Sequence, residues 1–224
     1  WARDWLKDFR PMRFGRRLWV CPGGQRPPGF ETASTNSSDV ADGAGSAEAA
    51  DAPVILELDP GLAFGTGTHA TTALCLAWLD SGAQGWLADA ELIDYGCGSG
   101  ILAVAALKLG ARSAIAMDID PQALLATREN AERNGVERHV LVTDDRECGG
   151  AAVDVLVANI LAGPLVELAP LLAARVRPGG RLALSGLLLE QADEVTAAYR
   201  PWFDIALTGT REDWGLLTGQ RRES

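Results

Sequence analysis

Glu91-Leu92-Ile93-Asp94-Tyr95-Gly96-Cys97-Gly98-Ser99-Gly100 is the stretch that decides the fold predicted for this chain. Its apolar residues indicate the end of a buried strand, and its three alternating glycines indicate a tight turn. The apolar run 101–109 then predicts a helix that ends at Gly110. A strand, a glycine turn and a helix open a nucleotide-binding βαβ unit. The glycines let a ligand approach the backbone, and the helix N-terminus offers free N–H groups.

The spacing of the glycines distinguishes two classes of nucleotide ligand. A dinucleotide fingerprint would require a glycine at position 101 after Gly96 and Gly98, and Ile101 stands there instead. Asp94 comes just before the turn, where a carboxylate would repel a pyrophosphate and attract a cation. S-adenosylmethionine has no phosphate and carries an ammonium and a sulfonium group. The pattern therefore favours this cofactor.

A second carboxylate supports the same interpretation. Asp118 ends the apolar run 114–117 and lies 22 residues after Gly96. An acid at this place in the fold accepts hydrogen bonds from ribose hydroxyls. The alternative is a solvated turn acid beside Asp120, with no ligand.

Composition and charge limit the possible functions. The 224 residues are 47% hydrophobic and 22% charged, which is ordinary for a globular protein. No apolar run is long enough to cross a membrane. The four cysteines are scattered and the chain has only two histidines, which argues against a metal site. The net charge of −10 argues against direct nucleic-acid binding. We expect a cytoplasmic monomer without metal, membrane or nucleic-acid partners.

Three parts of the chain differ in composition. Residues 1–21 combine an apolar helical face with a strand pattern at 14–20, and we expect them to form a connector. Residues 22–53 are rich in small and polar residues, and their acidic half, 31–51, has five acids and no base. This composition predicts a flexible, disordered insertion. Residues 54–224 are expected to form the S-adenosylmethionine-dependent domain.

Strand and helix patterns alternate through this last part, which predicts a doubly wound α/β fold with helices on both faces of a mostly parallel sheet. The last two strands have no helix between them and should form a hairpin, with the last strand antiparallel. Strands are expected at 54–58, 92–93, 114–117, 139–143, 153–160, 182–185, 203–208 and 214–218, helices at 70–79, 101–109, 121–134, 164–176 and 190–199, and a sharp turn at 178–180.

The loop 59–69 is rich in glycine and threonine, and Thr68 is expected to cap the helix 70–79. A P-loop would need a lysine before its final hydroxyl residue, and none stands there. Two interpretations stay open from the residues alone. The loop is either a rigid turn before the helix or a mobile cover for a ligand.

Several motifs resemble known enzymes. DYGCGSG at 94–100, Asp118 and the terminal hairpin resemble the seven-stranded S-adenosylmethionine-dependent methyltransferases. Within that class, DPGLAFGTGTHATT at 59–72 and NILA at 159–162 resemble the methyltransferases of large-subunit ribosomal protein eleven. FRPMRFG at 9–15 is similar to the connector of the same family.

The resemblance implies a Rossmann-like sheet of seven strands and an enzyme that methylates lysine side chains and the α-amine of that ribosomal protein. The chain departs from the family pattern at Ala70, where proline is usual, and in its longer insertion. The family's small N-terminal domain, which grips the ribosomal protein, has no counterpart in the chain. We therefore expect normal cofactor binding but slow methylation of the ribosomal protein.

Asn159 is the main candidate for catalysis, because it ends a strand at the carboxyl edge of the sheet. Its side-chain oxygen could accept a hydrogen bond from an incoming amine. His69 could take a proton, or it only hydrogen-bonds within its loop. The pattern and the resemblance together place seven residues at the cofactor, namely Phe64, Thr72, Asp94, Gly96, Gly98, Asp118 and Asn159.

Two other functions remain as alternatives. A nicotinamide-dependent oxidoreductase is disfavoured by Ile101, and binding assays with both cofactors would separate it from a methyltransferase. A cofactor-binding or assembly module without catalysis, or with a different acceptor, would differ in turnover on the ribosomal protein.

Overall fold

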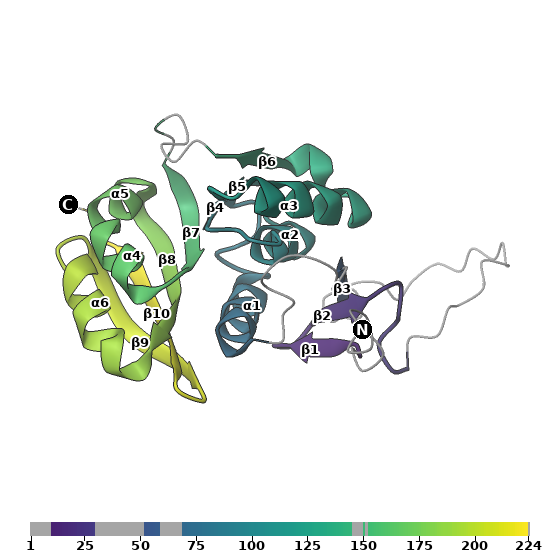
Figure 1. The fold of residues 1–224 in the computed structure, drawn as a ribbon, viewed down its shortest axis with the longest axis horizontal. Helices are drawn as coiled ribbons and strands as arrows, with labels where there is room; N and C mark the ends of the chain where they lie inside the picture. The colour runs from purple at the N-terminus through teal and green to yellow at the C-terminus, as the bar shows by residue number, and fades with distance from the viewer. Residues whose placement is uncertain (1–9, 30–51, 59–68, 145–149, 151, 224) are drawn as a thin grey trace, which may run out of the picture.

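A computed structural model describes residues 10–29, 52–58, 69–144, 150 and 152–223 of the chain (Figure 1). The helix expected within residues 1–9, the acidic segment 31–51 and most of the loop 59–69 lie outside the described residues. The described part contains a sheet of seven strands and a separate sheet of three. No helix in it is long and apolar enough to cross a membrane.

The larger sheet has the strand order β6-β5-β4-β7-β8-β10-β9. Its first five strands are parallel, and β10 runs antiparallel to both of its neighbours. The predicted α/β fold, with its mostly parallel sheet and antiparallel last strand, is confirmed. The strands are β4 (Glu91–Tyr95), β5 (Ser113–Met117), β6 (Val140–Thr143), β7 (Val153–Asn159), β8 (Val176–Leu188), β9 (Phe203–Arg211) and β10 (Trp214–Arg221).

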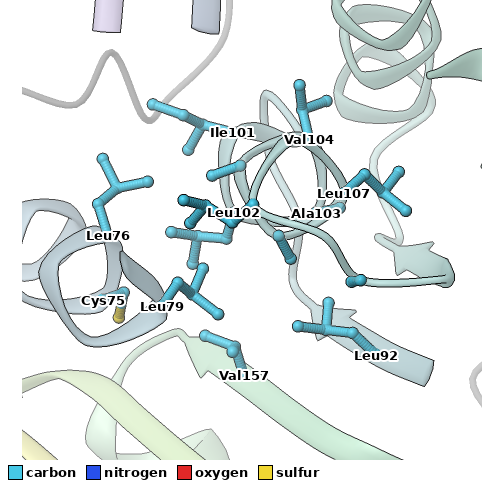
Figure 2. Close-up of a cluster of buried hydrophobic side chains, with 14 of the residues drawn as sticks. Cys75, Leu76, Leu79, Leu92, Ile101, Leu102, Ala103, Val104, Leu107 and Val157 are labelled. Carbon is cyan, nitrogen blue, oxygen red and sulfur yellow. The ribbon is translucent and has the colours of Figure 1, made fainter. Parts of the chain in front are cut away.

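Helices cover both faces of this sheet. They are α1 (Ala70–Gly82), α2 (Ile101–Lys108), α3 (Pro121–Arg133), α4 (Ala162–Glu167), α5 (Ala169–Ala174) and α6 (Ala192–Tyr199). Successive strand residues point to opposite faces, so Leu92 packs with the first three helices and Ile93 with the last three. Figure 2 shows α1 and α2 side chains meeting above Leu92 and Val157. Burial on both faces explains why apolar residues follow one another directly at Leu92 and Ile93 in β4 and at 155–158 in β7.

Three of the predicted elements differ from those in the structure. The single helix expected at 164–176 is two helices, because Pro170 has no N–H to continue the helical bonding and Leu168 ends α4 and begins α5. The sharp turn expected at 178–180 is an irregularity within β8, opposite Val153 to Val155 of β7. The helix expected from 190 begins as a 3-10 turn (Leu189–Gln191) before α6.

The smaller sheet consists of β1 (Met12–Phe14), β2 (Leu18–Pro22) and β3 (Val54–Leu58). β1 and β2 form an antiparallel hairpin, so the single strand predicted at 14–20 is wrong. The chain turns at Gly15, whose φ of +70° favours glycine, and an added Cβ would collide with the Asp80 carboxylate. β3 then pairs with β2 in parallel.

Two side chains attach the smaller sheet to the rest of the molecule. Asp80 of α1, which is 7% exposed, accepts hydrogen bonds from the backbone N–H groups of Arg16, Arg17 and Leu18. Asn134, after α3, accepts from the Glu57 N–H at 2.8 Å and donates to the Glu57 carbonyl at 2.7 Å. The Asn134 amide thus pairs with β3 as a neighbouring strand would. Figure 1 shows the smaller sheet beside α1, on the side away from β8 and β10.

Replacing Asp80 with alanine is expected to lower the free energy of unfolding by about 1.5–3 kcal/mol, because three backbone donors lose a charged acceptor. Urea unfolding measures this difference. Glu129→Ala, on the exposed side of α3, is the control and should change the free energy by no more than about 0.5 kcal/mol. Equal stability of Asp80→Ala and the wild type would contradict the anchoring role.

Candidate functional site

A cavity of about 390 Å³ lies at the carboxyl ends of β4 and β7. Ligands bind at this edge of open parallel sheets, because the loops that follow the strands meet there. The cavity brings together five of the residues predicted from the sequence, namely His69, Thr72, Gly96, Gly98 and Asn159. They come from the start of α1, the turn after β4 and the end of β7.

The glycine turn after β4 is held from below by β5. The backbone N–H groups of Gly96 and Cys97 both donate to the Met117 carbonyl at 2.8 Å. Gly96 has a φ of +75°, and an added Cβ would collide with the Ile160 side chain that follows β7. Glycine is therefore required at this position by both backbone conformation and packing. The turn is placed against the cavity with its backbone accessible to a ligand.

Asp118 follows β5 and is bonded to the same turn. One oxygen accepts from the Gly98 N–H at 2.9 Å, and the other accepts from the Asp120 N–H at 3.0 Å. The side chain is partly exposed beside the cavity, and the next residue, Ile119, is 68% exposed. An oriented carboxylate can accept hydrogen bonds from a ribose. An apolar side chain next to it can pack against the flat face of a base.

Asp94 lies beneath the glycine turn, outside the set of residues that line the cavity. It is 1% exposed, and its Oδ2 accepts from the Ala103 N–H in the first turn of α2 at 3.0 Å. Its Oδ1 has no hydrogen-bond partner within the described part of the chain. Burial raises the pKa of Asp94 to about 7. The Ala103 hydrogen bond opposes this shift, and the Asp118 charge adds to it.

Asn159 and Thr72 both line the cavity and are joined by a hydrogen bond. The Asn159 amide nitrogen donates to the Thr72 hydroxyl at 3.3 Å, which leaves the amide oxygen without a hydrogen-bond partner among the described residues. This hydrogen bond joins the end of β7 to the first turn of α1. It orients the amide so that its oxygen is available to a ligand.

His69 is the N-cap of α1. Its Nδ1 accepts from the Thr71 N–H at 3.4 Å and lies 2.8 Å from the Thr71 hydroxyl. The imidazole packs edge-on against the Trp214 ring at the start of β10, with a centroid distance of 4.9 Å. The N-cap predicted at Thr68 is wrong, because His69 holds that position. The cofactor contact predicted at Phe64 lies outside the described residues.

Sequence reasoning missed several residues of the cavity wall, namely Thr71, Ile160, Leu161, Gly186 and Trp214. Leu161 is 69% exposed at the mouth. An added Cβ on Gly186 would collide with the Ile160 backbone, so β8 touches the loop after β7 at this point. Thr71, Ile160 and Leu161 stand within the motifs at 59–72 and 159–162, which was a signal for them. Gly186 directly follows the predicted strand 182–185, and an isolated glycine in a strand often marks a close backbone approach.

A larger hollow of about 670 Å³ lies elsewhere on the sheet, around Arg181, Arg200 and Phe203. Arg181 pairs with Val155 near the amino end of β7, whereas Ser185 pairs with Asn159 at its carboxyl end. The hollow therefore lies toward the opposite edge of the sheet from the glycine turn. None of the residues predicted for the site lines it.

Comparison with known proteins gives consistent matches over nearly the whole chain. A family model described as ribosomal protein L11 methyltransferase matches residues 1–222. Proteins named ribosomal protein L11 methyltransferase from Shewanella baltica (strain OS223) and Shewanella amazonensis are each 52% identical over 223 residues. Each match covers 99% of this chain and 68% of the relative.

Solved structures agree with the sequence matches. A ribosomal protein L11 methylase from Lactobacillus delbrueckii subsp. bulgaricus has a TM-score of 0.76 and 30% identity, covering 96% of this chain and all of that one. A Thermus thermophilus 16S rRNA methyltransferase in complex with AdoMet and guanosine has a TM-score of 0.58 and 20% identity, covering 71% of this chain and 45% of that one. This second likeness shows the fold alone.

Asp94 is expected to make stability fall as the pH rises from about 4 to about 7. Its pKa is about 7 in the folded chain, against an ordinary value of about 3.9 in the unfolded chain. Between these values the folded state holds a proton that the unfolded state has released, so a rise in pH favours unfolding. Free energies of unfolding measured across this range for the wild type and Asp94→Asn test it. The substitution should flatten the fall, and identical pH profiles would contradict the burial of an ionisable Asp94.

Proposed function

Because the chain belongs to the family of ribosomal protein L11 methyltransferases, we propose that it transfers methyl groups from S-adenosylmethionine to ribosomal protein L11. The acceptors in this proposal are lysine side chains and the α-amine. The observation that carries the proposal is the convergence of the glycine turn, Thr72 and Asn159 on one cavity beside Asp118. We further propose that the protein is a monomer that acts in the cytoplasm, where ribosomal proteins are available.

The residues at the cavity fit S-adenosylmethionine better than a phosphate-bearing cofactor. No lysine or arginine stands among the described residues that line the cavity, so no side-chain cation there would neutralise a pyrophosphate. Asp118, beside the turn, could accept hydrogen bonds from the ribose hydroxyls, and Gly96 and Gly98 leave the backbone open. Thr72 and Asn159 supply the polar side chains on the opposite wall. Asp94 lies beneath the glycine turn, where its charge could act on a cationic ligand through the turn.

When bound, S-adenosylmethionine supplies a methyl group on a positively charged sulfur. The protein's task is to hold an amine nitrogen in line with that group, and positioning of this kind supplies much of the rate. The amine must also be neutral, whereas a free lysine has a pKa of about 10.4. The apolar wall of Ile160, Leu161 and Trp214 would desolvate the ammonium and favour its deprotonated form.

Asn159 is the residue proposed to receive the amine. Its amide nitrogen is engaged by Thr72, so the amide oxygen is the group left to accept a hydrogen bond from the amine N–H. When a hydrogen-bond acceptor binds an N–H on one side of the amine nitrogen, the nitrogen lone pair points away from that acceptor. His69 is held through Nδ1 by Thr71 and packs on Trp214, an arrangement that favours a hydrogen-bonding role over that of a general base.

Asp118→Ala is expected to weaken S-adenosylmethionine binding at least about tenfold, because hydrogen bonds to a charged group contribute about 1.5–3 kcal/mol. Isothermal titration calorimetry measures the dissociation constant. Glu132→Ala, an exposed acid of α3, removes the same charge without touching the turn and should bind as the wild type does. An unchanged affinity in a folded Asp118→Ala protein would remove this residue from the cofactor site.

The proposed activity is tested with isolated ribosomal protein L11 and S-adenosylmethionine carrying a labelled methyl group. Label should appear in L11, and peptide mass spectrometry should locate it on lysine side chains and the α-amine. Asn159→Ala should lose most of the turnover while keeping its fold, whereas Gln220→Ala, an exposed amide far from the cavity, should not. Cofactor binding without transfer to L11 would contradict the proposed acceptor, and no binding would contradict the proposed cofactor.

A further inference from the structure

Two buried polar side chains of α3 bind the glycine turn on its far side from the cavity. Thr127, which is fully buried, donates through its hydroxyl to the Gly98 carbonyl at 3.1 Å. Asn130, which is 4% exposed, donates through its amide nitrogen to the Ser99 carbonyl at 2.8 Å. Neither residue lines the cavity. Their hydrogen bonds therefore act on a ligand only through the turn.

The same helix is joined to the turn by a second route. Asp118 accepts from the Gly98 N–H and also from the N–H of Asp120, which is the N-cap of α3. The Gly98 residue is thus held at both of its backbone polar groups, by Asp118 at the N–H and by Thr127 at the carbonyl. The connection is closed: Asp118 links Gly98 to the start of α3, and Thr127 further along α3 links the helix back to Gly98.

Packing between the turn and α3 is close. The Thr127 hydroxyl lies 3.3 Å from the Cys97 sulfur, and an added Cβ on Gly100 would collide with the Thr127 side chain. Such a fit leaves the turn no room to relax toward the helix. The hydrogen bonds from α3 to the Gly98 and Ser99 carbonyls then determine the direction in which the backbone groups of the turn point.

We propose that Thr127 and Asn130 are positioning residues for cofactor binding, which fix the glycine turn and Asp118 as one unit. This inference rests on the proposed function of the cavity. Loss of the Thr127 hydroxyl or of the Asn130 amide would remove the donor that holds one carbonyl of the turn, and the turn could then shift. The expected consequence is a weaker cofactor complex, with little change in the transfer step once cofactor is bound.

The test compares Thr127→Val and Asn130→Ala with two matched controls. Thr196→Val removes a buried threonine hydroxyl from α6, and Asn134→Ala removes a buried amide just beyond the end of the same helix α3. The dissociation constant for S-adenosylmethionine should rise about three- to tenfold in each test variant, as the loss of one hydrogen bond predicts. It should stay at the wild-type value in both controls, whatever their thermal stability.

Three further readouts separate positioning from general destabilisation. In steady-state kinetics, KM for the cofactor should rise while kcat at saturating cofactor is retained. Thr127→Ser, which keeps the hydroxyl, should restore most of the affinity. In the cofactor-free protein, amide hydrogen exchange at Gly98 should accelerate in Thr127→Val and not in Thr196→Val.

Wild-type affinity in both test variants would overturn the inference, as would an Asn134→Ala defect equal to that of Asn130→Ala. A wild-type protein that does not bind S-adenosylmethionine would instead overturn the proposed function. The exchange measurement needs no cofactor, so unchanged exchange at Gly98 in Thr127→Val would count against the positioning role in that case too.

Discussion

The hydrogen bond between the Gly98 N–H and the Asp118 carboxylate joins the ends of two neighbouring strands, and the site is arranged around it. β4 and β5 are parallel and paired so that Tyr95 lies opposite Met117. Their carboxyl ends are therefore level, and the residues that follow must meet. The glycine turn can bend back over the sheet because its backbone adopts φ values that other residues disfavour. The meeting of the two loops at this edge thus follows from strand register.

Burial on both faces of the sheet gives this edge its rigidity, and it also imposes a cost. The strands beneath the turn are covered by helices on each side, so Asp94 at the end of β4 lies in an apolar environment with one oxygen unpaired. A carboxyl group so placed destabilises the fold once it is ionised. The presence of Asp94 at this point is understandable if its charge serves a cationic ligand above the turn.

Local patterns predicted most of the fold and five of the thirteen described residues that line the candidate cavity. The glycine turn, Asp118 and the ends of β4 and β7 follow from strand and turn signals a few residues long, which depend little on the rest of the chain. The hairpin at Gly15 was not predicted, because the carboxylate that holds it, Asp80, is more than 60 residues away. Trp214 was not predicted at the cavity for the same reason, since only the sheet order brings β10 beside His69.

Thr127 and Asn130 show a different limit, because polar residues in a helix pattern are ordinarily taken as solvated, and only the structure shows them buried against the turn. Pro170 carried a local signal, but a proline near a helix start and a proline that divides a helix look alike in sequence.

The smaller sheet has a consequence for how the chain can vary. β2 and β3 are paired in register, and each is separately attached to the main domain, β2 through Asp80 and β3 through Asn134. The two ends of the segment between them are therefore fixed without help from the segment itself. Closing a longer connection costs only about 0.6 kcal/mol for each doubling of its length. This crossing is accordingly a place where the chain can gain or lose residues in evolution, or accept an inserted reporter domain, with little effect on the carboxyl edge of the larger sheet.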